Sequence, residues 1–267
     1  MKNIVAVPNT VKITDITHVN SRMTTIELDA RIEMDPGQFI MLWIPRVDEK
    51  PFSVVAPDPL TLSVACIGPF TNKLKEMKAG DKLGWRGPYG KGFRIIGKKV
   101  LIVGGGCGLA SVYHLITACT KQGLAVDVVA AFKTAEEAFL LEEIKATGAN
   151  VNVCTDDGTE GFKGYATDKV KELIADKTYD QVYSCGPEIM MSLLRDVLDR
   201  AKLPYQFSLE RYMKCGIGIC DKCSINGQLV CQDGPVFNQD QIKQLTEFGK
   251  FKRIGTGEKV PSLPEAC

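Results

Sequence analysis

A cysteine-rich stretch from Met213 to Cys231 constrains this chain more than any other part of its sequence. The stretch holds four of the ten cysteines, with the spacing C-x4-C-x2-C-x7-C: Cys215, Cys220, Cys223 and Cys231. The first three follow the loop spacing of plant-type iron–sulfur proteins, in which thiolates hold a two-iron cluster. Gly216 and Gly218 lie between the first two cysteines, where a loop that wraps a cluster needs positive φ angles. The stretch therefore predicts a [2Fe-2S] site.

A structural zinc site is the alternative, because four cysteines also suit tetrahedral zinc. Zinc ribbons usually show two separated C-x2-C pairs, and this stretch has a single one. The spacing thus favours a two-iron cluster over zinc, and it favours both of these over disulfides.

The composition is that of an ordinary globular protein. With 267 residues, 45% of them hydrophobic and 24% charged, the chain is long enough for two domains and a small appendage. Its net charge of +1 gives no reason to expect nucleic acid or an acidic membrane as partner. No apolar run approaches the roughly 18 residues of a membrane span. Residues 1–10 do not resemble a secretory signal, and ten cysteines then suit a reducing compartment, so we expect a cytoplasmic protein.

The first third of the chain has a β-like pattern. Short candidate strands alternate with turns that contain proline or glycine, and they cover residues 11–18, 23–28, 39–43, 52–55, 61–66 and 82–85. This pattern predicts a small closed antiparallel β barrel over residues 1–96, with one helix near residues 72–77.

After residue 96 the pattern changes to strands that alternate with helices. The expected strands cover residues 100–103, 126–131, 151–154, 181–184 and 205–209. The expected helices cover residues 109–121, 136–147, 167–174 and 188–201. Such alternation predicts a doubly wound, Rossmann-like α/β domain with a parallel sheet over residues 97–208. Residues 209–267 would then form a small cluster domain and a tail, with a helix near residues 239–248.

Two turns of the α/β domain suggest a dinucleotide site. The glycine run 104–108 joins a strand to a helix, where a pyrophosphate can meet helix N–H groups, although Leu109 departs from G-x-G-x-x-G. Cys185-Gly186-Pro187 ends a later strand and would face the same crevice. Taken alone, Cys185 is better interpreted as a small buried residue, and His18 and His114 as core or surface residues.

Six short segments follow one another along the chain: Lys50-Pro51-Phe52-Ser53, Gly68-Pro69-Phe70-Thr71, Gly87-Pro88-Tyr89-Gly90, Gly104–Gly108, Asp157-Gly158 and Cys185-Gly186-Pro187. In this order they resemble the ferredoxin-reductase-like flavoproteins. With Glu210–Cys220 and Asp233–Phe237 added, the chain resembles the electron-transfer subunits of two-subunit, NAD-linked dihydroorotate dehydrogenases over about residues 10–237.

The resemblance implies FAD on the barrel. Pro51, Phe52 and Ser53 match the strand that faces the isoalloxazine ring, and Gly68 and Thr71 match the turn at the pyrophosphate. A further flavin-facing loop matches Gly87, Gly90 and Gly92. The family usually has arginine where this chain has Lys50, and lysine offers the phosphates only a point charge.

The resemblance also implies sites for NAD(H) and for the cluster. The pyrophosphate turn of NAD(H) matches Gly104, Gly106 and Gly108, and the segment near the nicotinamide ring matches Cys185, Gly186 and Pro187. The four clustered cysteines match the ligands of the [2Fe-2S] cluster. NADH and NADPH are not distinguished by these motifs.

The resulting hypothesis is an NAD-linked flavin iron–sulfur subunit that carries electrons. A hydride from NADH would reduce FAD, and single electrons would pass through the cluster to a flavin in a separate catalytic subunit that oxidises dihydroorotate in pyrimidine biosynthesis. No segment resembles a pyrimidine site, so we expect an obligatory partner and a largely apolar contact face near the cluster. Electron-input subunits of sulfhydrogenase, sulfite reductase or transhydrogenase type are the alternatives, and a non-enzymatic zinc-bearing scaffold is a remote one.

Overall fold

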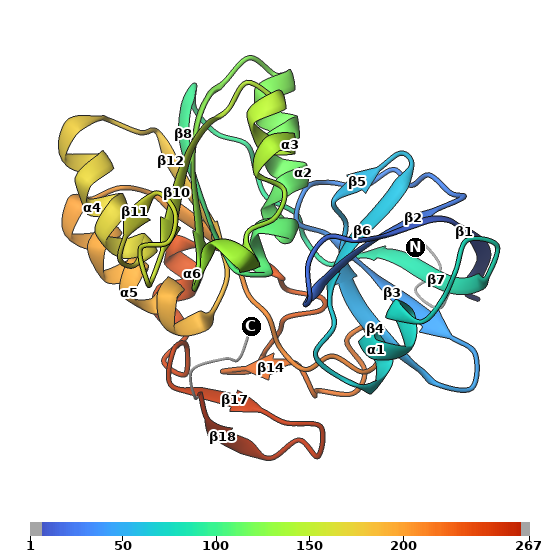
Figure 1. Cartoon of the computed structure of the whole chain (residues 1–267). Coiled ribbons are helices and arrows are strands. Elements are labelled where there is room, and N and C mark those ends of the chain that lie inside the picture. Colours follow the sequence, from blue (N-terminus) through green and yellow to red (C-terminus); the bar gives the residue numbers. More distant parts are fainter. Residues whose placement is uncertain (1–6, 263–267) are drawn as a thin grey trace.

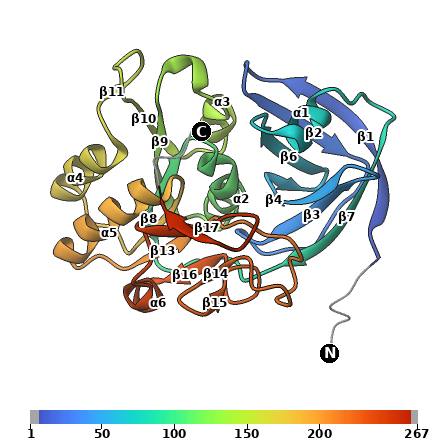
Figure 2. The same cartoon turned by 90° about the horizontal axis from the view of Figure 1, so that it is seen from below.

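Two seven-stranded sheets dominate the computed structural model, which describes residues 7–262. The first sheet uses the N-terminal strands and the second is covered by helices, and the C-terminal segment crosses below the junction between them (Figures 1 and 2). This three-part arrangement confirms the predicted combination of an antiparallel β domain, an α/β domain and a small C-terminal cluster segment.

The first sheet has the order β4-β3-β7-β1-β2-β6-β5, and all its neighbouring strands are antiparallel. Its strands are β1 (Asn9–His18), β2 (Met23–Leu28), β3 (Phe39–Ile44), β4 (Asp48–Ser53), β5 (Ala56–Pro57), β6 (Leu60–Ala65) and β7 (Lys82–Tyr89). Buried and more exposed residues alternate along β6, because one face of the curled sheet encloses its own core. The short helix α1 (Pro69–Lys75) buries Phe70 and Leu74 in that core.

The sheet is a curled half-barrel, and its closure differs from the prediction. In the described chain the end strands β4 and β5 do not pair with each other. Pro51 lies in β4 and Pro57 in β5, and proline lacks the N–H group that a ladder needs. Both strands are therefore suited to be edges, and the barrel stays open between them.

The second sheet has the order β11-β10-β9-β8-β12-β13-β16 and is parallel except at its last pair. Its strands are β8 (Lys99–Gly105), β9 (Ala125–Phe132), β10 (Asn150–Thr155), β11 (Phe162–Lys163), β12 (Gln181–Cys185), β13 (Tyr205–Ser208) and β16 (Val236–Asn238). The helices are α2 (Gly108–Lys121), α3 (Leu141–Ala146), α4 (Ala166–Asp176) and α5 (Glu188–Ala201). Helices α2 and α3 cover the face toward the half-barrel, and α4 and α5 cover the other (Figure 1). The predicted doubly wound sheet is confirmed.

The helix predicted over residues 136–147 is broken in the structure. A 3-10 turn η1 (Ala135–Glu137) comes first, and α3 begins only at Leu141. Leu140 between them has a left-handed backbone with φ of 60°. The break turns Phe139 into the core, where the centroid of its ring lies 5.8 Å from that of Phe132. The free energy gained by burying this ring outweighs what a continuous helix would contribute.

The C-terminal segment is more structured than the sequence indicates. It contains the hairpins β14 (Ser224–Ile225) with β15 (Gln228–Leu229) and β17 (Phe251–Arg253) with β18 (Lys259–Pro261), and the short helix α6 (Gln239–Gln244). Strand β16 pairs antiparallel with β13, so residues beyond 208 complete the second sheet. Asn238 caps α6 by accepting a hydrogen bond from the Gln241 N–H at 3.0 Å.

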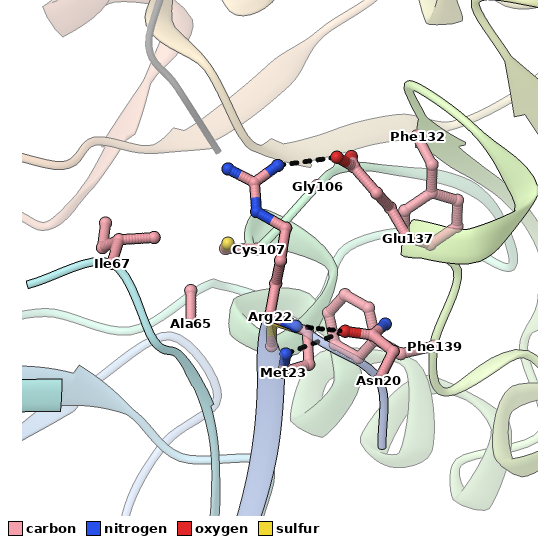
Figure 3. Close-up of a pocket in the computed structure, with 10 residues that line it drawn as sticks. All are labelled: Asn20, Arg22, Met23, Ala65, Ile67, Gly106, Cys107, Phe132, Glu137 and Phe139. Atoms are coloured by element: carbon pink, nitrogen blue, oxygen red, sulfur yellow. Dashed lines mark hydrogen bonds and ion pairs between the residues drawn. The ribbon is translucent and has the colours of Figure 1, made fainter. Parts of the chain in front are cut away.

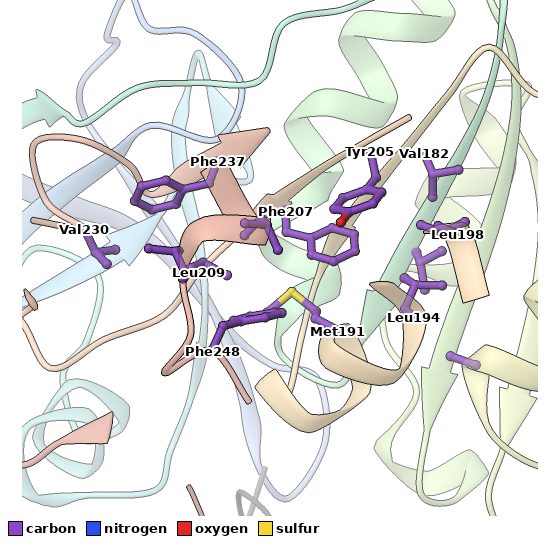
Figure 4. Packing of buried hydrophobic residues seen from close by; sticks show 14 of the residues in the cluster. Val182, Met191, Leu194, Leu198, Tyr205, Phe207, Leu209, Val230, Phe237 and Phe248 are labelled. Atoms are coloured by element: carbon purple, nitrogen blue, oxygen red, sulfur yellow. The ribbon is translucent and has the colours of Figure 1, made fainter. Parts of the chain in front are cut away.

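One core joins this segment to the α/β domain (Figure 4). Phe207 of β13 stacks on Tyr205 at 4.6 Å between ring centroids, and the ring of Phe248 lies 6.3 Å from Phe207 on its other flank. Met191 of α5 and Phe237 of β16 belong to the same buried cluster. The residues after the cysteine stretch are therefore held by hydrophobic packing.

Replacing the buried ring of Phe248 by alanine should cost about 3–5 kcal/mol of the free energy of unfolding, because the cavity adds to the lost transfer free energy. Phe251 is 38% exposed, so Phe251→Ala is the matched control and should cost less than about 1 kcal/mol. Urea unfolding of both variants checks this, and equal losses would contradict the packing described.

Candidate functional site

The two turns predicted to bind a dinucleotide lie side by side at the carboxyl edge of the parallel sheet. Strands β8 and β12 are neighbours, and Gly104 is in register with Cys185. The strand order reverses between β8 and β12, which is the point where such sheets form a ligand crevice. Gly106 follows β8 directly, and Gly186 and Pro187 follow β12, so the structure brings the predicted NAD(H) residues to one place.

Close backbone packing explains the glycines of this edge. A Cβ on Gly108 would collide with the carbonyl group of Cys185, and one on Gly105 would lie 2.6 Å from the Met190 sulfur. A Cβ on Gly104 would lie 2.6 Å from the Leu109 side chain. The two turns interlock only because these positions carry no side chain.

Cys185 lines this edge as a neutral thiol. It is buried, and burial raises the pKa of Cys185 to about 12, although Ser111 and Ser208 hydrogen-bond the sulfur. A thiol with this pKa is not a nucleophile at neutral pH. Cys185 therefore supplies shape and polarizable surface to the crevice.

A cavity of about 20 Å³ lies between the two sheets, beside the glycine turn (Figure 3). Gly106 and Cys107 line it from the α/β side. Across it, Arg22 Nη1 of the half-barrel donates to Glu137 Oε1 at 2.6 Å. Asn20 Oδ1 accepts from the N–H groups of Arg22 and Met23 and fixes the turn that carries the arginine. The ion pair links the two sheets at the crevice.

The motifs predicted to face FAD lie on β4, α1 and β7. Phe52 stacks on Phe70 with 5.9 Å between ring centroids. Thr71 Oγ1 accepts from the N–H groups of Ile67 and Gly68, both at 3.0 Å, and a Cβ on Gly68 would meet nothing within 4 Å. The start of α1 thus has a fixed backbone with open space in front of Gly68.

Lys50, which replaces the usual arginine, is engaged by neighbours. Its Nζ lies 2.5 Å from Asp48 Oδ2 and 5.6 Å from the centroid of the Tyr212 ring. The hydrogen bond from Lys50 lowers the pKa of Asp48 against a smaller effect of burial. Lys50 therefore connects the edge strand to the segment before the cysteines.

The glycines of the third flavin motif have a packing role in this structure. A Cβ on Gly90 would lie 2.5 Å from Pro235 Cδ, and Gly90 has φ of 75°. A Cβ on Gly92 would lie 2.6 Å from the Pro36 carbonyl oxygen, and one on Gly87 would lie 3.2 Å from that of Phe39. These positions let the end of β7 pass close to β3 and to the C-terminal segment.

The four cysteines of the stretch form two pairs. The thiol of Cys215 is hydrogen-bonded with that of Cys220, and the thiol of Cys223 with that of Cys231. Within residues 7–262, no three Cys, His, Asp or Glu side chains converge closely enough to hold one metal ion. The order of these neighbouring thiols along the chain matches a two-iron cluster, in which each iron takes two thiolates.

Backbone N–H groups point at these sulfurs. The N–H of Ile217 lies 3.5 Å from Cys215 Sγ, and the N–H of Cys231 lies 3.4 Å from Cys223 Sγ. Burial raises the pKa of Cys215, but backbone N–H groups and the Cys220 thiol outweigh it and bring the value to about 7. The hydrogen bond from Cys231 lowers the pKa of Cys223 to about 7. One thiol of each pair is therefore prepared to ionise, as metal binding requires.

Comparison with known proteins identifies the family. Residues 210–243 match the iron–sulfur cluster binding domain of dihydroorotate dehydrogenase B, and residues 102–196 match an oxidoreductase NAD-binding domain. A probable dihydroorotate dehydrogenase B (NAD(+)) electron transfer subunit from Methanocaldococcus jannaschii is 43% identical over 93% of this chain and 96% of its own length. The chain belongs to the family of dihydroorotate dehydrogenase B electron transfer subunits.

Other relatives agree with this assignment. A subunit of the same name from Methanothermobacter thermautotrophicus is 41% identical over 96% of this chain and 98% of its own length. Among solved structures, a chain of the NADH-dependent reduced ferredoxin-NADP oxidoreductase, studied for flavin-based electron bifurcation, has a TM-score of 0.79 at 25% identity and covers 93% of this chain and 95% of its own. The ferredoxin reductase of carbazole 1,9a-dioxygenase shares the fold, with a TM-score of 0.66 at 20% identity, and covers 75% of this chain and 68% of its own.

Two ion pairs of this family member were not foreseen from the sequence. Arg86 with Glu49, and Arg211 with Glu188, join elements far apart in the chain, and both arginines are largely buried. Each pair lies beside a recognised motif: Arg86 precedes Gly87, and Glu188 follows Pro187. A charged residue directly beside a glycine–proline motif is the sequence feature that could have indicated both ion pairs.

In residues 7–262, no helix is both long and apolar enough to cross a bilayer.

Gly216→Ala should abolish or strongly reduce cluster loading, because Gly216 has φ of 72° and a Cβ would lie 2.8 Å from Met41 Cγ. The matched control is Gly227→Ala, which has φ of 80° but no atom within 4 Å of the added Cβ. Iron content and visible absorbance per chain, measured after anaerobic purification, check this. Equal cluster loading in the two variants would contradict the idea that a side chain at position 216 prevents the loop from packing on Met41.

Proposed function

We propose that this chain is the electron-transfer subunit of a two-subunit dihydroorotate dehydrogenase, and that it moves electrons between NAD(H), FAD and a [2Fe-2S] cluster. The observation that carries this proposal is the four-cysteine stretch inside a matched iron–sulfur domain, which packs on the strands with the flavin motifs. FAD, when bound, supplies the exchange between a two-electron hydride donor and one-electron carriers.

Each cysteine pair would hold one iron. Cys215 and Cys220 would bind the first, and Cys223 and Cys231 the second. The N–H groups aimed at Cys215 and Cys223 support this assignment, because such donors stabilise thiolate charge and tune a cluster.

The crevice between β8 and β12 would hold NAD(H). Gly104, Gly106 and Gly108 would let the pyrophosphate approach the start of α2, where N–H groups and the helix dipole favour negative charge. The nicotinamide ring would lie at Cys185, Gly186 and Pro187. The raised pKa of Cys185 keeps its thiol uncharged, so no thiolate would lie beside the ring.

FAD would lie along the edge of the half-barrel. Pro51, Phe52 and Ser53 would face the isoalloxazine ring, with Lys50 beside them. Gly68 and Thr71 would meet the pyrophosphate, which the open space at Gly68 supports. Gly87, Gly90 and Gly92 would line the flavin on their outer side. The proposed division into residues 1–96, 97–208 and 209–267 assigns one cofactor to each part.

A flavin-containing catalytic subunit would complete the enzyme. Ile219, next to the ligand Cys220, is 77% exposed, and Tyr212 is 38% exposed on the same segment. Exposed apolar residues beside an electron exit suit a protein partner. The partner would bind dihydroorotate. The two subunits would work in the cytoplasm, where reducing conditions suit a chain with ten cysteines.

The names of the relatives favour this assignment over the other electron-input subunits. Relatives at 40–43% identity carry the dihydroorotate dehydrogenase name, whereas the bifurcating oxidoreductase is 25% identical. A zinc-bearing scaffold does not fit the matched iron–sulfur and NAD-binding domains.

The purified chain should oxidise NADH with ferricyanide but should reduce NAD+ with dihydroorotate only after the catalytic subunit is added. Cys223→Ser should remove the dihydroorotate-dependent reaction and leave most of the ferricyanide reaction, because only the former needs the cluster. Cys119→Ala, in α2, is the control and should retain both. Dihydroorotate oxidation by the chain alone, or full coupled activity of Cys223→Ser, would contradict the proposal.

A further inference from the structure

Arg86 connects the half-barrel directly to the cysteine stretch. It lies in β7, and its Nη2 donates to the carbonyl oxygen of Cys215 at 2.7 Å. Its Nη1 lies 3.3 Å from the Tyr89 hydroxyl, and its guanidinium carbon lies 5.5 Å from the centroid of that ring. The side chain is 12% exposed, so the contact is shielded from water.

Glu49 fixes the orientation of this arginine. The carboxylate accepts from Arg86 Nε at 2.7 Å and from Nη2 at 2.6 Å, which is the two-pronged geometry that only a guanidinium offers. The hydrogen bonds that Arg86 donates to Glu49 raise the pKa of Arg86, so the guanidinium keeps its positive charge. The glutamate is 20% exposed, and it directly precedes Lys50 in β4.

The pair therefore lies beside two of the three flavin motifs and contacts the cluster loop. Glu49 directly precedes the segment 50–53, and Arg86 directly precedes Gly87. The same Nη2 group that bonds Glu49 also donates to the carbonyl oxygen of Cys215. Met41 of β3 supports the same contact, because its side chain occupies the space that a Cβ on Gly216 would need. The cysteine loop therefore packs against Met41 of the half-barrel, and Arg86 makes a polar contact that holds the loop there.

We propose that Arg86, oriented by Glu49, is a positioning residue that sets both the placement of the cluster relative to the flavin-facing strands and the charge beside Cys215. This inference deepens the proposed function and rests on it. A shielded charge close to a redox centre changes its potential more than an exposed one, because water screens it less.

The paired charges make the sign of each effect predictable. In the wild type the guanidinium and the carboxylate offset one another. Arg86→Met would leave a negative charge near Cys215, which disfavours the reduced and more negative cluster, so the midpoint potential should fall. Glu49→Gln would leave a positive charge there, and the potential should rise. The double variant, Arg86→Met with Glu49→Gln, carries neither charge. Its midpoint potential should therefore return close to that of the wild type.

Placement is separated from charge by a conservative change. Arg86→Lys keeps the positive charge but cannot make the forked contact to Glu49 and Cys215 together. Its potential should stay near that of the wild type, while cluster reduction by NADH should slow severalfold. The double variant should be slow for the same reason, since it also lacks the anchor.

The experiment is an EPR-monitored redox titration of the cluster in the whole purified chain, together with stopped-flow absorbance after mixing with NADH. Each single-charge variant should shift the equilibrium between the oxidised and reduced cluster by about tenfold, which is 59 mV for a one-electron couple, in opposite directions. Lys177→Met is the matched control: it removes a partly buried ion pair, to Asp127 at 2.9 Å in β9, and should leave the potential unchanged.

Shifts of the same sign in Arg86→Met and Glu49→Gln, or no shift in either, would overturn the proposal. A double variant or Arg86→Lys with wild-type reduction kinetics would overturn the placement part of it. Glu49→Gln keeps the size of the side chain and one of its two acceptor oxygens, so the test stands even where Arg86→Met does not fold. A wild-type chain without iron or flavin would instead refute the proposed function.

Discussion

The packing of the C-terminal segment across the junction of the two sheets is the interaction on which the rest of the structure depends. Strand β16 pairs with β13, Pro235 fills the space beside Gly90, and Arg86 holds the carbonyl group of Cys215. These contacts are short-range, and they tolerate no added side chain at the glycines involved. They place the cysteine pairs against the strands with the flavin motifs, so the redox groups proposed for this chain would lie in one continuous structure.

A buried ion pair connects the same segment to the nucleotide crevice. Arg211 bonds Glu188 through both carboxylate oxygens, and Glu188 Oε1 also accepts from the Gly249 N–H at 2.6 Å. Glu188 opens α5 directly after Pro187, and Arg211 lies four residues before Cys215. Removing one member would leave an uncompensated buried charge, which is far more costly than losing an exposed pair. The crevice and the cysteine stretch therefore share a rigid support.

Much of the fold and of the site could be predicted because it is encoded locally. The apolar strand before Gly104 and the helix after it gave the parallel sheet, and the spacing of the cysteines gave the kind of site. The open edge of the half-barrel and the break at Leu140 were missed, because Pro51, Pro57 and the burial of Phe139 act through tertiary neighbours. The contact between Arg86 and Cys215 joins residues 129 positions apart, which no local pattern reveals.

An absorption spectrum of the anaerobically purified chain, recorded before and after NADH is added, tests the central claim most directly. Iron and flavin are assayed on the same sample. The account predicts flavin bands and a broad visible shoulder, both bleached by NADH, with about two irons and one flavin per chain. A colourless sample that contains one zinc would contradict the redox function, and flavin bands with one zinc in place of iron would contradict the assignment of the paired cysteines.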